Sequence, residues 1–318
     1  MKKSKVQAAV LIPTYNREKI LKICLSNLLK SRGRKYFHIY VIDNGSTDNS
    51  QELVNSFKSI YYLKEKNNLF ISRAINNAFF NHRLYKKYKY VVILANDVLV
   101  NSETINRLIT YMSKNPRVAV SGPIHFDLLI NKRLNKGLLI NPFTSLLANK
   151  VPLYIKSSIN HFHSCFIVRS DVFHKVNGFN YVLYPMIFEE PDLGERILSL
   201  NYHIRPCVGA KIWHPIELTR VKQQEVNFRE REDRLYNSLP KAYLFFRNRI
   251  IYMRLHSSII GFILFYFLFN PIIFFYYLTK IRIDFLRYVF LGILDGTIFA
   301  IFKDINYIKK QNMKVLHI

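Results

Sequence analysis

Short apolar runs alternate with helical patterns near the start of this chain, and this alternation limits the fold more than any other sequence feature. Residues 17–31 follow the first run with apolar side chains at helical spacing, from Leu21 to Leu28. The runs, each short enough for a buried strand, are 10–12, 37–42, 60–63 and 90–94. This order of strands and helices predicts an α/β fold, a parallel sheet with helices on both faces.

Two further helices are predicted, one over 71–83 and one that begins at the N-cap residue types Ser46 and Thr47 and ends near Phe57. The pattern blurs between 125 and 160, after which we expect a strand at 162–168 and a helix at 192–200. Beyond about residue 218 the composition changes to a charged segment and then a long apolar one. We therefore expect a domain at 1–218 and a helical region at 219–318.

Polar residues gather where the predicted strands end. Ligands of parallel α/β sheets bind at the carboxyl ends of the strands, so these residues are candidates for a binding site. The sequence Asp-Asn-Gly-Ser after the second strand is also favourable turn chemistry, and both interpretations stay open. The strand-end residues are Thr14, Tyr15, Asn16, Asp43, Asn44 and Asp97.

The chain is strongly basic, with 47 Lys and Arg against 21 Asp and Glu, a net charge of +26. Such a charge favours an anionic partner, which is a nucleic acid, a phosphorylated substrate or an acidic membrane face. The sequence contains no nucleic-acid motif and no platform of aromatic and basic residues, and its charge is spread along the chain. We therefore expect no nucleic-acid partner.

The three cysteines, Cys24, Cys165 and Cys207, lie far apart and show no metal or redox spacing. We expect them to be reduced packing residues. The apolar run from Ala8 to Ile12 ends at a proline and is too short for the core of a signal peptide. We therefore expect the amino-terminal region to stay in the cytoplasm.

The segments Pro13-Thr14-Tyr15-Asn16-Arg17 and Asp43-Asn44-Gly45-Ser46-Thr47-Asp48 resemble the opening of family-2 glycosyltransferases. The resemblance covers roughly residues 8–215 and implies the GT-A fold, a nucleotide-binding sheet joined to an acceptor-binding half. Phe246-Arg247-Asn248 and the stretch from Gly292 to Gly296 are similar to elements of a rhamnosyltransferase-like branch. The remaining matches, in the family's order, are Asn68 with Asn76, Asn96-Asp97, Gly178-Phe179, residues 188–193, Arg196 and Trp213-His214.

The resemblance implies a binding site for a nucleotide-diphosphate sugar, in which the family uses the position of Asp43 for the nucleotide. Tyr15 would stack on the base or belong to the core, and Arg73 would meet a phosphate or lie on a solvated helix face. The residues implied for this site are Pro13, Thr14, Tyr15, Asn16, Arg17, Asp43, Asn44, Ser46, Asn68, Arg73, Asn96, Asp97 and Glu189.

The resemblance also implies a divalent ion, Mg²⁺ or Mn²⁺, bound by Asp97 and His214. Relatives usually carry two acids, or Asn-x-Asp, where this chain has Ala95-Asn96-Asp97, so the first acid is missing. One carboxylate suits such an ion when phosphate and water oxygens supply most of its ligands. The alternatives are a turn at the end of the strand and a structural histidine.

Glu189-Glu190-Pro191-Asp192 matches the acidic segment that supplies the general base in relatives. The base maps to Glu190, with Asp192 as the fallback, because Glu replaces the usual Asp. Inverting sugar transfer requires a carboxylate that removes the proton of the acceptor hydroxyl during attack on the anomeric carbon. The alternative is an acidic helix start, which the helix dipole favours.

The apolar stretch Ile259–Thr279 is long enough to span a bilayer. Residues 280–318 hold seven Lys or Arg against three Asp, and a single span would put this basic tail outside. We also expect Asn270-Pro271 to break the helix. These features favour a hairpin or in-plane segment on the inner leaflet, with 283–302 as an interfacial helix. Deletion of 250–318 should then release a soluble catalytic part; a buried helical subdomain or dimer interface is the alternative.

The sequence therefore predicts an inverting glycosyltransferase at the cytoplasmic face of the cell membrane. It would move a hexosyl or deoxyhexosyl group from a nucleotide-diphosphate sugar to a hydroxyl of a glycan acceptor, expected to be lipid-linked, in bacterial surface polysaccharide synthesis. The alternative is a catalytically degenerate homologue that acts as a membrane scaffold, which Ala95 and Glu190 favour.

Overall fold

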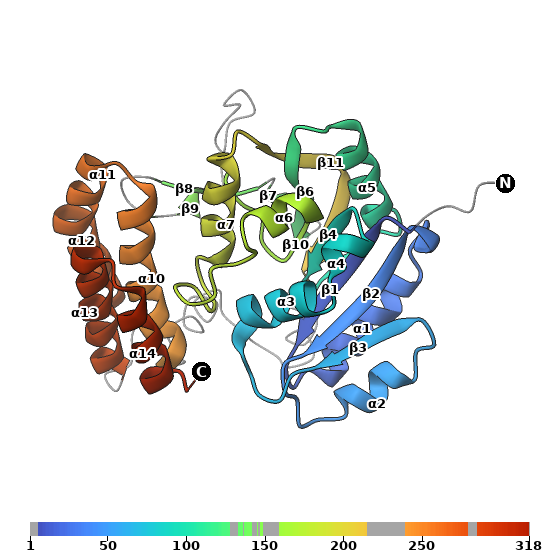
Figure 1. Cartoon of the computed structure of the whole chain (residues 1–318), viewed down its shortest axis with the longest axis horizontal. Helices are drawn as coiled ribbons and strands as arrows, with labels where there is room; N and C mark the ends of the chain where they lie inside the picture. The colour runs from blue at the N-terminus through green and yellow to red at the C-terminus, as the bar shows by residue number, and fades with distance from the viewer. Residues whose placement is uncertain are drawn as a thin grey trace. The chain divides into compact units, whose positions relative to one another are not determined.

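The chain forms two compact units in a computed structural model (Figure 1). The sheet unit comprises 1–139, 149–179 and 193–222, and the helical unit comprises 140–148, 180–192 and 223–318. The expected boundary at 218/219 lies outside the described residues, and two earlier segments belong with the carboxyl-terminal helices. The structure describes residues 6–127, 133–135, 137–141, 145, 147–148, 159–214, 239–278 and 285–317.

A nine-stranded mixed sheet forms the sheet unit, in the order β3-β2-β1-β4-β10-β6-β11-β5, with β7 paired to β6. Its first four strands in this order are parallel, as predicted. Strand β10 runs antiparallel to both of its neighbours, and β5 antiparallel to β11. The strands are β1 (Ala8–Thr14), β2 (Phe37–Asp43), β3 (Ile60–Lys64), β4 (Tyr90–Leu94), β5 (Leu99–Val100), β6 (Val118–Asp127), β7 (Arg133–Asn135), β10 (Cys165–Arg169) and β11 (His203–His214). A separate pair is β8 (Leu139–Ile140) with β9 (Leu147–Ala148).

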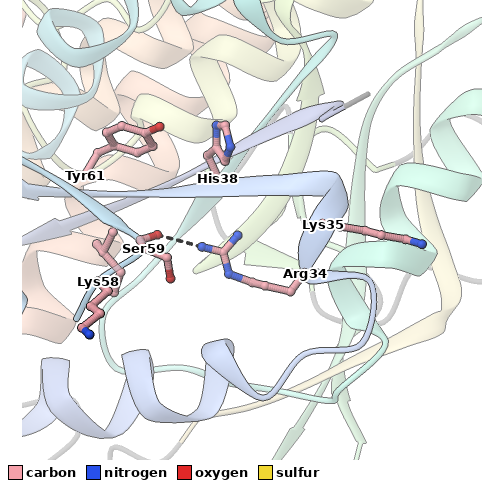
Figure 2. A pocket seen from close by; sticks show the side chains of 7 residues that line it. Arg34, Lys35, His38, Lys58, Ser59 and Tyr61 are labelled. Atoms are coloured by element: carbon pink, nitrogen blue, oxygen red, sulfur yellow. Dashed lines mark hydrogen bonds between the residues drawn. The ribbon is translucent and has the colours of Figure 1, made fainter. Parts of the chain in front are cut away.

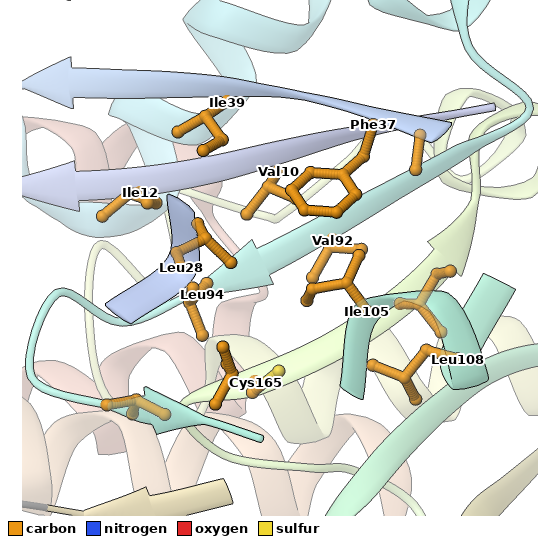
Figure 3. Packing of buried hydrophobic residues seen from close by; sticks show 14 of the residues in the cluster. Val10, Ile12, Leu28, Phe37, Ile39, Val92, Leu94, Ile105, Leu108 and Cys165 are labelled. Atoms are coloured by element: carbon orange, nitrogen blue, oxygen red, sulfur yellow. The ribbon is translucent and has the colours of Figure 1, made fainter. Parts of the chain in front are cut away.

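Helices cover both faces of this sheet because successive strand residues point to opposite sides. Val10 and Ile12 of β1 belong to one buried cluster, and Ala9 and Leu11 belong to the other. Figure 3 shows the first cluster, in which strand residues face Leu28 and Leu108 of two helices. The helices of this cluster are α1 (Glu18–Leu29), α2 (Ser50–Asn55) and α5 (Thr104–Lys114). Those of the other are α3 (Phe70–Asn81), α4 (Leu84–Lys87), α6 (Ser170–Lys175) and α7 (Glu189–Leu198). The predicted fold class is confirmed.

Several predicted boundaries differ from the structure, and strand β10 begins at Cys165 rather than at residue 162. Helix α2 begins at Ser50 rather than at Ser46. Asp48 accepts a hydrogen bond from the Ser50 N–H at 3.1 Å, whereas Ser46 and Thr47 bond to Asn16 instead. The short 3-10 helix η1 (Arg34–Tyr36) precedes β2, and helix α7 (Glu189–Leu198) begins three residues before the predicted helix.

All three cysteines are free and buried in the sheet unit, which confirms the expectation of reduced packing residues. Burial is the largest cause that raises the pKa of the Cys24 thiol, to about 12. Such thiols remain protonated at neutral pH and are poor nucleophiles.

The helical unit is built around α10, which packs on α13. Two glycines of α13 lie against the α10 backbone: a Cβ at Gly292 would meet the Tyr243 carbonyl oxygen at 2.4 Å, and one at Gly296 would meet the Arg247 carbonyl oxygen at 3.0 Å. Asp295 between them accepts hydrogen bonds from Tyr243 at 2.6 Å and Tyr307 at 2.5 Å. The helices are α10 (Leu239–His256), α11 (Ile259–Leu264), α12 (Asn270–Leu278), α13 (Leu286–Phe302) and α14 (Ile305–Val315).

The predicted helix break at Asn270-Pro271 is wrong. Helix α11 continues through a π-helical turn, η3 (Phe265–Phe269), into α12, and the Asn270 N–H bonds the Phe265 carbonyl oxygen five residues back. The wider turn changes the hydrogen-bond register just before the proline, which has no N–H to donate. Ile259–Tyr276 is the one helix in the described residues that is long and apolar enough to cross a membrane, with a mean hydropathy of 2.2 and 22% of it buried. One such helix is weak evidence for a span.

Candidate active site

The carboxyl ends of the parallel strands form a connected polar edge in the sheet unit. Thr14 of β1 lies opposite Asp43 of β2 in the sheet register. The side-chain amide of Asn96 donates to the Thr14 hydroxyl at 2.9 Å, and the Asn44 N–H donates to the Thr14 carbonyl oxygen at 2.9 Å. Thr14 therefore ties together the ends of three strands.

Asp43 is fully buried at this edge. One carboxylate oxygen accepts the Ser46 N–H at 2.7 Å, and the other accepts the hydroxyl of Tyr62. Burial, followed by the hydrogen bond to Asp43 and its charge, raises the pKa of Tyr62. The sequence interpretation missed Tyr62, whose only signal is an aromatic hydroxyl on the neighbouring strand β3. A nucleotide that binds Asp43 has to share or displace this hydroxyl.

The loops after β1, β2 and β3 are held to one another by short polar side chains. Asn16, at a positive φ of 50°, donates its N–H to the Ser46 hydroxyl at 2.9 Å, and Asn44 donates its side-chain amide to Asn68 at 2.8 Å. Gly45 has a φ of 83°, and a Cβ there would lie 2.9 Å from the backbone of Asn67. The Asp-Asn-Gly-Ser segment therefore does form a turn, as its residue types favour. Tyr15 beside the polar edge is 44% exposed.

Asp97 follows β4 and pairs with Arg17, whose guanidinium nitrogen lies 3.1 Å from a carboxylate oxygen. The side chains are 18% and 50% exposed, so both reach solvent. No group of three or more His, Cys, Asp or Glu that could hold a metal occurs among the described residues. One carboxylate fits a hydrated ion that arrives with a diphosphate, since Mg²⁺ is usually bound by one or two carboxylates plus phosphate oxygens.

The other predicted residues of the sheet unit lie in different surroundings. Pro13 is within β1, and Arg73 is partly buried in the first half of α3. Asn76, which matches the family, is buried and bonds both backbone groups of Phe179, at 2.8 and 3.0 Å. It therefore holds a turn rather than a ligand. His214 ends β11, and its side chain lies outside the described residues.

The predicted catalytic acids belong to the helical unit, at the start of α7. Asp192 is buried at 1% exposure, and its carboxylate lies 2.9 Å from the Nε2 of His256. Glu189 is also buried, whereas Glu190 is partly exposed. Of these three acids, Glu190 is therefore the one that solvent, and hence a substrate hydroxyl, reaches most readily. His256, the last residue of α10, carried no sequence signal.

A hollow of about 500 Å³ lies at the opposite edge of the sheet unit, where β2 and β3 begin. Figure 2 shows the side chains that line it. The Arg34 guanidinium donates hydrogen bonds to the Phe37 and Ser59 carbonyl oxygens, and the Lys35 side chain points away from the hollow. A seven-residue strand separates the two edges by roughly 20 Å. This hollow is therefore not part of the polar edge.

Comparisons with known proteins agree with this arrangement. The profile of the family described as glycosyl transferase family 2 matches residues 9–176, more than half of the chain. The chain belongs to this family. The matched residues contain β1 to β4 and the polar edge at their carboxyl ends, so the family resemblance predicted from the strand-end motifs is confirmed.

Two curated relatives of similar sequence have names that refer to a polymer. The chain is 32% identical to a chondroitin synthase of Escherichia coli over 118 residues, 36% of this chain and 17% of the relative. It is 26% identical to a poly(ribitol-phosphate) beta-glucosyltransferase of Bacillus spizizenii over 116 residues, 35% of this chain and 18% of the relative. The chain thus spans less than a fifth of the length of either relative.

Solved structures with similar folds confirm the GT-A architecture. The first 349 residues of S. aureus TarS match with a TM-score of 0.57 and 15% identity, covering 96% of this chain and 84% of the TarS chain. GalNAc-T7, solved with UDP, GalNAc and Mn²⁺, matches with a TM-score of 0.55 and 13% identity, covering 66% of this chain and 44% of that chain. At these identities the likeness shows the fold alone.

Proposed function

We propose that this family 2 protein is an inverting glycosyltransferase that moves a hexosyl or deoxyhexosyl group from a nucleotide-diphosphate sugar to a hydroxyl of a glycan. The observation that carries the proposal is the contrast among the acids of α7, since Glu190 is accessible while Asp192 is buried and paired with His256. An accessible carboxylate can take the proton of an acceptor hydroxyl, and a buried, paired one is better suited to hold the helix start.

The donor would bind at the polar edge of the sheet unit. Tyr15 offers an exposed ring for the base, Asp43 a carboxylate for the base or ribose, and Arg17 with Asp97 the groups that face a diphosphate. Asp97 would hold Mg²⁺ or Mn²⁺ together with phosphate oxygens, and that ion would offset the charge that builds up on the departing diphosphate. Arg17 would then turn from Asp97 to the phosphates.

The test of this function compares two variants of the acidic segment. Glu190→Gln should abolish sugar transfer and spare donor affinity, because a base acts only in the chemical step. Asp192→Asn should do less harm, through the contact with His256. Transfer is measured after a thermal-shift screen has identified the nucleotide sugar. If Glu190→Gln transfers normally while Asp192→Asn is dead, Asp192 is the base, and if both retain transfer, neither is.

The acceptor class is suggested by the relatives. A chondroitin synthase and a poly(ribitol-phosphate) glucosyltransferase carry polymers in their names, which supports a glycan acceptor in bacterial surface polysaccharide synthesis. Arg247 and Asn248 support placement in a rhamnosyltransferase-like branch. We propose a lipid-linked form of this acceptor because the helical unit exposes an apolar surface.

That surface runs along α11, η3, α12 and α13. Phe274 of α12 contacts Phe290 of α13, so the exposed rows of these helices adjoin. Exposed Arg287 and three exposed lysines of α14 add positive charge in the same unit. The surface thus suits the anionic cytoplasmic leaflet of the cell membrane. Its most exposed large hydrophobic residues are Ile259 (76%), Phe267 (75%), Phe302 (71%), Ile260 (70%), Ile301 (65%) and Phe275 (64%).

Vesicle flotation tests the membrane proposal. The full-length protein should float with vesicles of anionic phospholipid, and a variant with Phe267→Glu and Phe275→Glu should remain at the bottom of the gradient. Both positions are more than 60% exposed, so the core is spared. The alternative is an oligomer interface. In that case the full-length protein would be a monodisperse dimer without detergent and would not bind the vesicles, and the two substitutions would dissociate the dimer.

A specific observation favours the second candidate function, a catalytically degenerate membrane scaffold. Arg17 occupies the one carboxylate of the Ala95-Asn96-Asp97 segment, and the first acid is absent. A scaffold of this kind would bind no donor productively. Hydrolysis of a nucleotide sugar by the purified protein separates the two functions. Hydrolysis that is lost in Glu190→Gln supports the enzyme, and no hydrolysis by the parent protein supports the scaffold.

A further inference from the structure

Two consecutive residues directly before the acidic segment have left-handed backbones. Ile187 has a φ of 64° and Phe188 a φ of 74°, and neither is glycine. A positive φ is unfavourable for bulky residues and most of all for a β-branched one such as isoleucine. Such a conformation persists only where the surroundings impose it, and it is concentrated at functional sites. Something in the helical unit therefore holds this turn.

The side-chain amide of Asn248 provides that hold. Its Nδ2 group donates to the Met186 carbonyl oxygen at 3.0 Å and to the Ile187 carbonyl oxygen at 2.8 Å. Asn248 is fully buried, and its Oδ1 accepts a hydrogen bond from the Arg247 guanidinium at 2.9 Å. Because a guanidinium only donates, Oδ1 must face Arg247 and the amide N–H groups must face the turn.

The residues that precede the turn are held by the same network. Arg247 donates to the Leu183 carbonyl oxygen at 2.7 Å and to the Asn312 side chain at 2.5 Å. Asn312 donates in turn to the Val182 carbonyl oxygen at 2.7 Å. Arg247 is fully buried and Asn312 nearly so. Four backbone carbonyls of this segment are thus bound by three buried side chains.

One face of α10 lies along the whole segment. Asn248, Tyr252 and His256 are spaced by four residues, which places them in a row on a helix. Asn248 binds the turn, Tyr252 packs its ring 5.2 Å from that of Phe188, and His256 lies against Asp192. The row thus contacts the chain on both sides of Glu190.

We propose that Asn248 is a positioning residue for catalysis: it holds the left-handed turn at Ile187 and Phe188 and so aims Glu190 at the acceptor. This role rests on the proposed function, in which Glu190 is the base. Asn248 touches no substrate itself, and its effect passes through the backbone of the turn. Loss of its N–H donors should let the turn relax toward a negative φ and redirect the first turn of α7.

The substitution that tests this is Asn248→Asp, which preserves size and the contact with Arg247 but removes the two N–H donors. It should lower kcat about a hundredfold while donor affinity stays within twofold, whereas a role in packing alone predicts little change. Ile187→Gly in the same background should recover part of kcat, because glycine adopts a positive φ without penalty. Asn306→Ala, an exposed asparagine of α14, is the matched control and should resemble the parent.

Amide hydrogen exchange of 182–192 in the full-length protein gives a readout independent of turnover. Exchange there should rise in Asn248→Asp and not in Asn306→Ala. If kcat of Asn248→Asp stays within twofold while Glu190→Gln is dead, or if kcat falls without a rise in exchange, the positioning role is overturned. If instead Glu190→Gln transfers normally, the proposed base is wrong, and a parallel rise in exchange still supports the role of Asn248 in holding the turn.

Discussion

The two units hold their candidate functional residues in different ways. In the sheet unit, short polar side chains of neighbouring loops bind one another, as Asn16 binds Ser46 and Asn44 binds Asn68. In the helical unit, the acidic segment is held by side chains that come some sixty residues later, such as Asn248 on Ile187. The polar edge is therefore held by residues of contiguous motifs, whereas the acidic segment of α7 is held by a helix that lies far away in the sequence.

The largest expected effect follows from deletion of residues 250–318. Leu183, Tyr184 and Phe188 share a buried cluster with Ile250 and Ile251, so the deletion would strip the acidic segment of its core. The structure thus revises the expectation that this deletion releases a soluble catalytic part. We expect complete loss of transfer and an aggregated product, measured by activity and by size-exclusion chromatography. A soluble, active truncation would show that the acids need no support from the helices.

Removal of the divalent ion should have the next largest effect, and it concerns the sheet unit alone. Asp97→Asn or excess chelator should lower transfer by a hundredfold or more, because a bound cation contributes several kcal/mol to stabilising a departing diphosphate. Added Mn²⁺ should restore activity to the chelated parent and not to the variant. Full activity in chelator would show that no divalent ion is required, and Arg17 would then be the group that offsets the charge of the diphosphate.

Asp43→Ala should weaken binding of the free nucleotide diphosphate about tenfold, measured by calorimetry. It should also lower the free energy of unfolding by about 1–3 kcal/mol, since the Ser46 N–H and the Tyr62 hydroxyl lose their acceptor. Tyr62→Phe is the control, because it frees one oxygen of Asp43 and leaves the loop in place. Nucleotide affinity that is unchanged in Asp43→Ala would remove Asp43 from the donor site.

The smallest expected effect is a pH dependence of the sheet unit. Burial, followed by the nearby His163, holds the pKa of His161 well below its usual 6.5, so the folded state binds fewer protons than the unfolded state. Stability is then full above pH 6.5 and falls as the pH drops below it, by about 1 kcal/mol between pH 7 and 5.5. His161→Gln should flatten this part of the denaturant-measured profile, and the exposed His82→Gln should not.

Much of the sheet unit was predictable because strand periodicity and strand-end residues are local signals. The four parallel strands and the helices on both faces follow from such patterns. The antiparallel strand β10 lies between β4 and β6, and no pattern in the sequence indicates that order. Tyr62 was missed for the same reason, since its contact with Asp43 depends on the register of two strands.

The helical unit was less predictable, because its decisive contacts join distant residues. The Arg247-Asn248 pair was visible as a resemblance, yet nothing nearby indicates that it binds the turn before Glu189. The helix break expected at Pro271 did not occur, because a π-helical turn takes up the irregularity in the hydrogen-bond ladder. A row of residues at four-residue spacing, from Asn248 to His256, was the available clue.

The placement of the cysteines gives the sheet unit a built-in reporter. All three thiols of the chain are buried there, at 0–5% exposure, and the helical unit has none. A thiol reagent added under native conditions therefore reacts only when the sheet unit opens, and the labelling rate measures the free energy of that opening. If a variant of α10 or α13 loses transfer while the labelling rate is unchanged, the damage is confined to the helical unit. Damage to the helical unit can thus be told apart from damage to the sheet unit without an engineered label.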